Sequence, residues 1–477
     1  MVITRFAPSP TGHLHIGGLR TALYSFLHAR AKGGKFLLRI EDTDIERNSE
    51  EALFGILEAF KWVGLNYEEP MLFQSKRTAI YQEYAQKLLE SNHAYYCYLT
   101  KEELMDMRTN NKGANHANFS RKYRDFKGEI PKDIVPCIRI KAPMEGTISF
   151  NDGIKGEISF QASELDDFVI LRSDGTPTYN FVVAIDDALS GMTDIIRGDD
   201  HISNTPKQLL VYKALGFNIP RFYHIPMICN ERGKKLSKRD GALSVLEYRD
   251  NGILPEALLN FLFKLGYGHG DKEIFSLQEM IDCFEPHRIN SNPSGCNFSK
   301  LYWLNAEYIK AMNNDELAKL LNMPLLDSIT LDKRNILLDE LKTRVNELVS
   351  MRNSITQILH APLTNKDENN TQYAHYDSTL YKKLFTQETK EYLIKSLNHF
   401  IEKLQKQDIA QDKESIKILI QDYASSLTIK PAIFMQTLRL ALLGQKGGID
   451  LGACLYILGK NDSIKRIQTL IDFANIN

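Results

Sequence analysis

The residues best suited to chemistry lie in two short strings far apart in the chain, PSPTGHLHIGG at 8–18 and KKLSKR at 234–239. In the first string, His15, Gly17 and Gly18 stand where a loop meets a segment of helical periodicity. Unpaired backbone N–H groups and the positive end of a helix dipole make such a junction an anion site, and glycine lets a phosphate approach closely. His15 adds a side chain that can donate a hydrogen bond to a phosphate oxygen as its charge grows. The string therefore predicts a nucleotide site.

The second string lies in residues 230–244, a polar stretch that contains glycines and reads as an exposed loop able to change shape. Its cations are Lys234, Lys235, Lys238 and Arg239. Such a loop can close on a triphosphate and neutralise the departing pyrophosphate by position and charge. Taken alone, a basic run is usually a solvated surface, and an isolated H-x-G string is usually a histidine facing water. Their occurrence in one chain favours the functional interpretation of both.

The elements that must position the first string form a strand–helix–strand unit. Residues 2–7 are β-branched and aromatic, which predicts a strand that ends before Pro8. Apolar residues then recur at helical spacing until the glycines of 32–34, and 36–40 form a second apolar run. Such a unit builds parallel sheets, which bind ligands at the carboxyl ends of their strands.

Composition sets the broad class. The chain has 477 residues, of which 43% are hydrophobic and 25% charged, as expected of a folded protein with several domains. No stretch approaches the ~18 apolar residues of a membrane span, so we expect a cytoplasmic protein without a membrane partner. Six scattered cysteines favour free thiols in a reducing compartment. A net charge of −1 leaves any nucleic-acid binding to local basic patches.

The two strings together resemble the HIGH and KMSKS signatures of class I aminoacyl-tRNA synthetases. The first ends in Gly18, where the namesake signature has histidine. Glycine at this position is common in the glutamate branch. Further segments resemble bacterial glutamyl-tRNA synthetases over nearly the whole chain: LLRIEDTD at 37–44, DGTPTYNF at 174–181, DIIRGDDHISNTP at 194–206, FYHIPMI at 222–228 and LPEALLNFL at 254–262.

The resemblance implies an α/β Rossmann-type (HUP-like) class I catalytic domain with an inserted acceptor-binding α+β domain, followed by all-α anticodon-binding domains. The expected boundaries are 1–75 for the first half of the catalytic domain, 76–185 for the inserted acceptor-end-binding domain, 186–232 for the second catalytic half, 233–312 for the signature loop and stem-contact domain, and 313–370 and 371–477 for two helical anticodon-binding domains. Within these, 138–140 and 168–171 predict strands of the insertion and 193–197 a strand of the resumed sheet. The polar run 364–371 is expected to be a loop or linker between two helical bundles.

The resemblance also implies the site residues. The catalytic set is His15, Lys235 and Lys238, with Lys238 the lysine that contacts ATP. The ATP-binding set is His15, Gly17, Gly18, Asp200, Lys235, Leu236, Ser237, Lys238 and Arg239. The glutamate-binding set is Arg5, Ala7, Ser9, Glu41, Tyr179, Arg197 and His201.

The chemistry of the glutamate-binding set agrees with its assignment. Ser9 and Glu41 suit an α-ammonium group, whereas guanidinium groups and a phenol suit a side-chain carboxylate, which arginine can grip bidentately. Two alternatives remain open. Arg5 and Arg197 can form structural ion pairs, and the segment of Asp200 can cap a helix that starts near 204–206.

Contacts to tRNA are expected in two places. Residues 120–127 interleave cations with aromatics, which can follow a nucleic-acid backbone and stack on an unpaired base, and the family binds the acceptor end there. The candidates are Arg121, Lys122 and Arg124. Arg344 falls near an arginine that reads an anticodon base in some relatives. A solvated face and an ordinary surface arginine are the respective alternatives.

Metal use is expected to be limited to the Mg²⁺ that accompanies ATP. Some relatives carry a zinc knuckle after residue 95, with two closely spaced cysteines. Here Cys97 stands alone, Leu99 occupies the second position, and no partner follows before Cys137. A four-ligand site needs closer spacing, so we expect no structural zinc.

The implied activity is glutamate–tRNA ligation in two steps, in which ATP converts L-glutamate to an adenylate that is passed to the 3′ end of tRNA. Family members are generally monomers and need bound tRNA to activate glutamate. A non-discriminating or glutamine-tRNA-specific enzyme of the indirect amidation pathway is the alternative. More distant are a small-molecule nucleotidyltransferase, which has no use for residues 313–477, and a catalytically silent tRNA-binding paralogue, which would be expected to lose His15, Lys238 or the pocket arginines.

Overall fold

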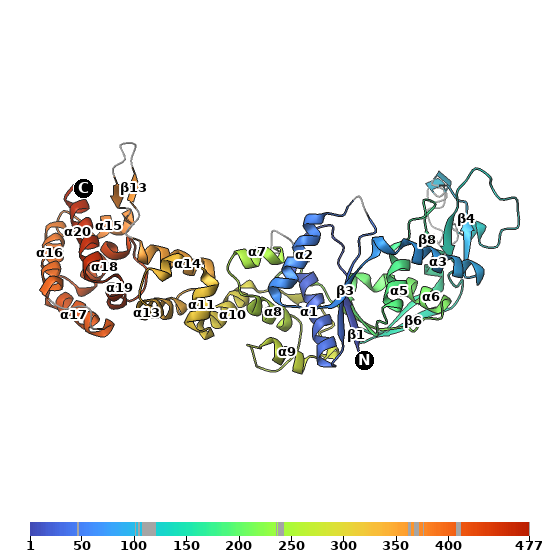
Figure 1. The fold of residues 1–477 in the computed structure, drawn as a ribbon, viewed down its shortest axis with the longest axis horizontal. Coiled ribbons are helices and arrows are strands. Elements are labelled where there is room, and N and C mark those ends of the chain that lie inside the picture. Colours follow the sequence, from blue (N-terminus) through green and yellow to red (C-terminus); the bar gives the residue numbers. More distant parts are fainter. Residues whose placement is uncertain are drawn as a thin grey trace. The chain divides into compact units, whose positions relative to one another are not determined.

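The computed structural model describes residues 1–44, 47–100, 102–103, 105–106, 121–234, 236, 243–360, 364–366, 372–374, 376–406 and 412–476. The chain divides into two compact units (Figure 1). The first comprises 1–249 and 255–301, and the second comprises 250–254 and 302–477.

The first unit is an α/β structure. Its strands are β1 (Ile3–Phe6), β2 (Lys35–Ile40), β3 (Glu68–Phe73), β4 (Ala94–Cys97), β5 (Cys137–Ile140), β6 (Thr147–Asp152), β7 (Gly156–Gln161), β8 (Val169–Leu171), β9 (Asp194–Gly198), β10 (Arg221–Ile225), β11 (Ile228–Cys229) and β12 (Ser294–Gly295). Its helices are α1 (Ile16–Ala31), α2 (Glu50–Val63), α3 (Thr78–Glu90), α5 (Tyr179–Leu189), α6 (Thr205–Ala214), α7 (Val245–Asp250), α8 (Pro255–Lys264) and α9 (Leu277–Cys283).

The parallel sheet has two halves that meet at β1 and β9. Strand β1 pairs with β2 and β2 with β3, all parallel. Strand β9 pairs in parallel with β10, and β10 with β6. Ile3 and Thr193 join the halves, because the backbone N–H of Thr193 donates to the Ile3 carbonyl at 3.1 Å and that of Ile3 to the Thr193 hydroxyl at 2.9 Å. The predicted strand–helix–strand unit and the resumed strand at 193–197 are confirmed.

This strand order creates a binding crevice. From the junction of β1 and β9, the neighbours β2 and β10 lie on opposite sides. In open parallel sheets a ligand binds outside the carboxyl ends of the strands at such a switch point. The carboxyl ends of β1 and β9 are therefore the place where the fold favours a site.

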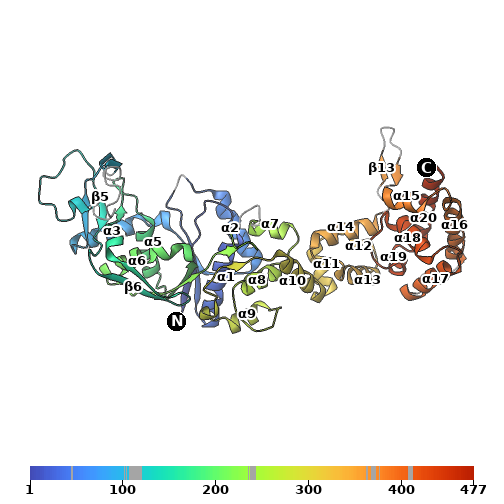
Figure 2. The same cartoon turned by 180° about the vertical axis from the view of Figure 1, so that it is seen from behind.

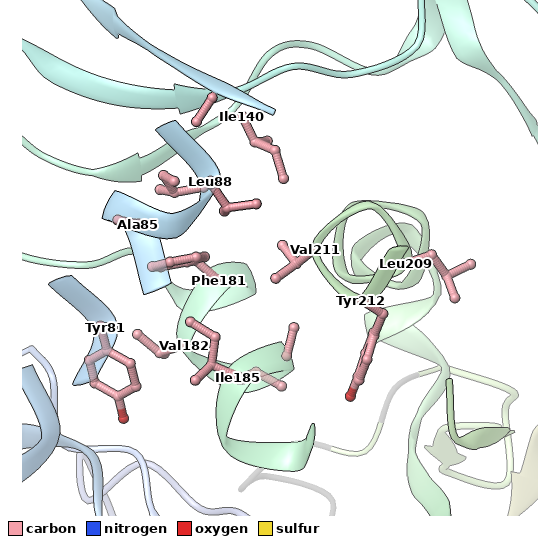
Figure 3. Close-up of a cluster of buried hydrophobic side chains, with 14 of the residues drawn as sticks. Tyr81, Ala85, Leu88, Ile140, Phe181, Val182, Ile185, Leu209, Val211 and Tyr212 are labelled. Atoms are coloured by element: carbon pink, nitrogen blue, oxygen red, sulfur yellow. The ribbon is translucent and has the colours of Figure 1, made fainter. Parts of the chain in front are cut away.

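One hydrophobic core joins the predicted insertion to the strands that follow it. Phe181 and Ile185 on α5 belong to the same buried cluster as Leu88 on α3, Ile140 on β5 and Val211 on α6 (Figure 3). The expected strands at 138–140 and 168–171 are β5 and β8, which pair antiparallel. The hairpin β6–β7 extends the β9–β10 sheet. The packing is thus continuous across residue 185, and the boundary placed there stays a prediction.

The second unit is mainly helical. Helix α20 packs against α16, α18 and α19 within it (Figure 2), and the helix predicted around 464–471 is confirmed. Its helices are α10 (Phe298–Ala311), which contains the boundary at residue 301, α11 (Asn314–Leu321), α12 (Pro324–Asp327), α13 (Leu331–Lys342), α14 (Leu348–Leu359), α15 (Ser378–Leu384), α16 (Lys390–Lys406), α17 (Lys413–Ser426), α18 (Pro431–Leu443), α19 (Leu451–Leu458) and α20 (Lys460–Ile476).

The polar run at 364–371 is not simply a loop. Strands β13 (Thr364–Lys366) and β14 (Gln372–Ala374) pair antiparallel. Two short strands can pair through their backbone hydrogen bonds without an apolar pattern in the sequence. Composition alone therefore predicted a linker. No described helix is long and apolar enough to cross a membrane.

Candidate active site

A cavity of about 740 Å³ in the first unit opens at the carboxyl ends of β1, β9 and β10 and at the start of α1. It brings together every described residue that was predicted to bind glutamate or ATP: Arg5, Ala7, Ser9, His15, Gly17, Gly18, Glu41, Tyr179, Arg197, Asp200, His201 and Leu236. Lys235, Ser237, Lys238 and Arg239 lie outside the described residues.

His15 is the N-cap of α1. Its Nδ1 accepts hydrogen bonds from the backbone N–H of Gly17 at 3.1 Å and of Gly18 at 3.2 Å. Because Nδ1 is an acceptor, the neutral ring carries its proton on Nε2. Two backbone N–H groups of this helix start, those of Gly17 and Gly18, are therefore occupied by the imidazole, although the sequence predicted unpaired N–H groups at the junction. An anion at this helix start meets the Nε2 donor of His15 instead.

Gly17 has a steric role in this cap. A Cβ atom at residue 17 would lie 3.0 Å from both Cε1 and Nδ1 of the His15 ring. That is tighter than ordinary van der Waals contact, so a side chain there would displace the imidazole. The glycine therefore keeps the histidine in place, and this accounts for the H-x-G spacing in physical terms.

Arg5 is held by a buried carboxylate from another part of the chain. Asp187 on α5 accepts from Arg5 Nε at 3.0 Å and from Arg39 Nη1 at 2.5 Å. Arg39 also donates to Glu41 at 3.0 Å. Burial opposes ionisation of Asp187, yet Arg39 and Arg5 hold its pKa below the ordinary value. The structural ion pair considered for Arg5 is thus present, and Arg5 lines the cavity as well.

Removing the Asp187 charge is expected to destabilise the first unit. Asp187→Asn leaves two buried arginines short of a partner, which should lower the free energy of unfolding by about 3–5 kcal/mol. Because the folded pKa of Asp187 lies below its ordinary 3.8, its contribution is present above that pH and lost as the pH falls through the folded value. Urea unfolding of the full chain between neutral and acid pH measures both effects.

The matched control is Asp125→Asn. The Asp125 side chain is 80% exposed and lies 3.4 Å from Lys141, so its loss should change stability by less than about 1 kcal/mol. Equal stability of the two variants would contradict the structural role of Asp187.

Arg197 has a different environment. Its guanidinium donates to three neutral acceptors, His224 Nε2 at 3.1 Å, Gln208 Oε1 at 2.8 Å and Thr205 Oγ1 at 2.8 Å. Arg197 is 5% exposed, and burial lowers its pKa. No carboxylate of the described residues forms an ion pair with it. Within the described residues, the structural ion pair considered for Arg197 is therefore absent. Arg197 lines the cavity as a buried cation that no described carboxylate pairs with.

Tyr179 and His201 line the cavity beside Arg197. The Tyr179 hydroxyl lies 3.2 Å from His201 Nδ1. Burial and then Arg197 lower the pKa of His201 to about 4, so this ring is neutral near pH 7. The alternative in which Asp200 and His201 cap a helix is not what the structure shows. The N-cap of α6 is Asn204, without a side-chain cap bond.

Glu41 supplies the negative wall of the cavity. It follows β2, is 9% exposed, and has its pKa raised by burial despite the neighbouring Arg39. Its backbone N–H donates to the Pro8 carbonyl at 3.0 Å, which ties the end of β2 to the loop that carries Ser9. A cation that approached Glu41 would stabilise its charged form, so the wall favours an ammonium group.

The predicted tRNA contacts are engaged within the protein. Arg121 and Arg124 lie 3.5 and 2.9 Å from the buried Asp167 carboxylate. Lys122 pairs with Glu103 at 2.9 Å, and Arg344 lies 3.3 Å from Glu340 one helical turn away. Arg121 and Arg124 face inward, whereas the side chains of Lys122 and Phe126 are exposed, so a tRNA contact of this segment stays a prediction.

Cys97 and Cys137 stand opposite each other on β4 and β5, with Cys137 Sγ 3.6 Å from the Cys97 carbonyl. All six cysteines are free thiols. In the described part of the chain, no group of three or more His, Cys, Asp or Glu residues could hold a metal ion.

Sequence reasoning missed the residues that hold the cavity's arginines. Asp187, Arg39, Gln208, His224 and Asp152 are all buried polar groups. Their one sequence signal is polarity inside apolar runs, as for the histidine of FYHIPMI. Such a residue is predicted to be buried and hydrogen-bonded, but the sequence does not indicate its partner.

Comparison with known proteins assigns the family. A family described as tRNA synthetases class I (E and Q), catalytic domain, matches residues 1–303, and an anticodon binding domain matches 300–471. Glutamate–tRNA ligase 2 of Nitratiruptor sp. is 54% identical over 472 residues, and glutamate–tRNA ligase 1 of Helicobacter hepaticus is 51% identical over 475, each covering 99% of both chains.

A solved structure is also similar. The glutamate tRNA ligase of Elizabethkingia meningosepticum, in complex with its amino acid, shares 30% identity with a TM-score of 0.86 over 99% of both chains. With the cavity at the switch point, the histidine-capped helix and these matches, the chain belongs to the class I tRNA synthetases of the glutamate and glutamine branch.

Proposed function

We propose that the chain is a glutamate–tRNA ligase that uses ATP. The observation that carries this proposal is the buried Arg197 guanidinium, which lines the cavity with three neutral partners and no protein carboxylate among the described residues. A buried cation of this kind selects an anionic group on a small substrate. Glutamate supplies that group, whereas the neutral amide of glutamine does not.

The remaining walls fit the other end of glutamate. Glu41 and Ser9 suit the α-ammonium group, and the Tyr179 hydroxyl adds a donor beside Arg197 for the side-chain carboxylate. The α-carboxylate then remains to react with ATP. The cavity thus offers a carboxylate for the ammonium group and a guanidinium for the side-chain carboxylate.

His15 and the signature loop serve ATP. The α-carboxylate oxygen attacks the α-phosphorus, the bond to pyrophosphate breaks, and glutamyl-adenylate forms. His15 Nε2 donates to the phosphate, where negative charge accumulates, and no general base is needed. Lys235 and Lys238 carry charge for the departing pyrophosphate, and Mg²⁺ enters as part of the ATP substrate. A ribose hydroxyl of the terminal adenosine of tRNA then attacks the carbonyl carbon, so that an ester bond forms as the bond to AMP breaks and the hydroxyl proton leaves with the AMP phosphate.

The finer assignments rest on the family resemblance. We assign the acceptor end of tRNA to the region 76–185, its stem to 233–312, and the anticodon to 313–370 and 371–477. A cytoplasmic monomer is the form that the resemblance favours. Discrimination between glutamate and glutamine tRNAs lies in these regions rather than in the cavity.

The test is charging of separately transcribed glutamate and glutamine tRNAs with labelled glutamate and ATP, with unlabelled glutamine as competitor. We expect labelled glutamate on glutamate tRNA and no competition by glutamine, because glutamine cannot neutralise Arg197. Charging of both tRNAs, or of glutamine tRNA alone, would place the enzyme in the indirect amidation pathway. Charging of neither would contradict the proposal and favour a silent paralogue.

A further inference from the structure

A chain of buried polar groups lies behind Arg197, outside the cavity. His224 on β10 is fully buried and Asp152 on β6 is 2% exposed. His224 Nε2 lies 3.1 Å from Arg197 Nε, and His224 Nδ1 lies 2.7 Å from Asp152 Oδ2. Three segments separated by tens of residues are thus connected in a line that ends at the guanidinium, and the Thr205 hydroxyl lies 3.1 Å from the same His224 Nε2.

The direction of every hydrogen bond in this line is fixed. Arginine Nε–H can only donate, so Nε2 of His224 accepts and Nδ1 carries the ring proton. The Nδ1–H of His224 donates to Asp152, whose carboxylate oxygens act only as acceptors. Oδ1 takes the backbone N–H of Ile154 at 3.0 Å and of Lys155 at 2.9 Å, and Oδ2 takes that of His224 at 3.1 Å.

The charge states agree with these directions. Burial opposes ionisation of Asp152, but the hydrogen bonds from His224, Lys155 and Ile154 lower its pKa. Burial also lowers the pKa of His224, with Arg197 acting in the same direction and Asp152 opposing. A neutral imidazole therefore stands between the carboxylate and the guanidinium.

This arrangement orients Arg197 without cancelling its charge. Asp187 shows the contrast, because it contacts Arg5 and Arg39 directly and so offsets part of their charge. If Asp152 touched Arg197 in that way, a protein carboxylate would compete with the substrate carboxylate for the same cation. We propose that Asp152 and His224 are positioning residues for substrate selection, which hold Arg197 through a neutral ring so that its charge is available to glutamate. The inference rests on the proposed function and deepens it.

Asp152→Asn is the primary variant. The Asn oxygen must stay at the Oδ1 position to accept from Ile154 and Lys155, which places the amide N–H₂ opposite His224 Nδ1. The ring proton then moves to Nε2, so that two N–H donors, those of His224 Nε2 and Arg197 Nε, face each other. We expect the KM for glutamate to rise about 10- to 100-fold, as for an unsatisfied buried charge. The KM for ATP should be unchanged, and selectivity for glutamate over glutamine should fall.

Two variants of His224 separate positioning from packing. In His224→Gln the amide oxygen can take the place of Nε2 and still accept from Arg197. In His224→Asn the shorter amide reaches Asp152 but leaves Arg197 Nε unpaired. The KM for glutamate should rise more in His224→Asn than in His224→Gln. Equal increases in both would show a packing role and overturn the inference.

Asp194→Asn is the matched control. Asp194 is fully buried at the start of β9 and lies 3.2 Å from the buried His28, away from the cavity. The variant removes another buried carboxylate that faces a buried histidine, so any KM change caused by instability would appear here too. We expect a wild-type KM for glutamate. The same increase in Asp194→Asn and Asp152→Asn would overturn the inference.

Nitrogen NMR of the His224 ring tests the tautomer without any assay of activity. A proton on Nδ1 in the wild-type chain, moved to Nε2 in Asp152→Asn, supports the inference, and a wild-type proton on Nε2 overturns it. If the wild-type chain charges tRNA but Asp152→Asn keeps its KM for glutamate, the inference fails and the proposed function stands. If the wild-type chain charges no tRNA, the proposed function fails and the inference fails with it.

Discussion

Replacing Arg197 by glutamine is expected to lower kcat/KM for glutamate on the order of 10⁴-fold, because a site built on a buried charge loses its selectivity with that charge. The glutamine amide can donate to at most two of the three acceptors Thr205, Gln208 and His224, but it leaves no buried charge, so the fold should persist. The KM for ATP should be unchanged, since His15 makes none of these contacts. Steady-state charging with glutamate and ATP varied separately measures both constants.

Arg221→Gln is the control for this change. Arg221 lies on the neighbouring strand β10, and its side chain is 65% exposed and pairs with Asp194 at 2.9 Å. Because Arg221 is mostly exposed and does not line the cavity, its loss should leave kcat/KM for glutamate at the wild-type level. If Arg197→Gln kept its KM for glutamate, or lost ATP binding to the same degree, the charge-selection role of Arg197 would be wrong.

Arg197→Lys separates the effect of the positive charge from that of the guanidinium geometry. Lysine keeps a cation in the cavity but cannot hold three fixed acceptors and a carboxylate in one plane. Its kcat/KM for glutamate should fall between those of the wild type and Arg197→Gln. That order would show that the hydrogen bonds behind Arg197 contribute to selection as well as its charge.

The local elements could be predicted from the sequence because their signals are local. A β-branched strand, a helix with regular apolar spacing and a second strand gave β1, α1 and β2 in parallel register. The residues that line the cavity came from the family resemblance, and the structure brings every described one of them to the same crevice. Parallel strand topology explains this, since the carboxyl ends of β1, β2 and β9 meet at one edge.

Pairing partners could not be predicted, because they depend on contacts between distant segments. Arg197 is held by His224, 27 residues away, and His224 by Asp152, 72 residues away. The same limit applies to Arg121 and Arg124, whose spacing suggested an exposed basic patch. Only the fold shows that Asp167 turns both of them inward.

The first signature shows a subtler limit. The sequence predicted an anion site at the start of α1, with unpaired backbone N–H groups as donors and glycines that let a phosphate approach. The structure gives the amides of Gly17 and Gly18 to His15 Nδ1 instead. The glycines are needed so that the ring can cap its own helix, and the site's donor moves to Nε2.

His15→Asn is therefore expected to lower kcat about 10²- to 10³-fold, the usual cost of losing one donor to a developing oxyanion. Asparagine is a preferred N-cap residue, so its side-chain oxygen can accept from Gly17 and Gly18 as Nδ1 does. Its amide is too short to reach where Nε2 stands. Stability to urea and the KM for glutamate should stay near wild type, while pyrophosphate exchange with ATP slows.

His15→Gln is the matched variant, because it is expected to keep the donor and weaken the helix cap. Its longer side chain can present an N–H near the Nε2 position but is a poorer cap, so some stability should be lost while more of kcat is kept. The two variants thus assign the cap to one ring nitrogen and catalysis to the other. Wild-type kcat in His15→Asn would contradict this assignment, because the histidine would then act only as a helix cap and the transition-state donor would have to come from elsewhere in the cavity.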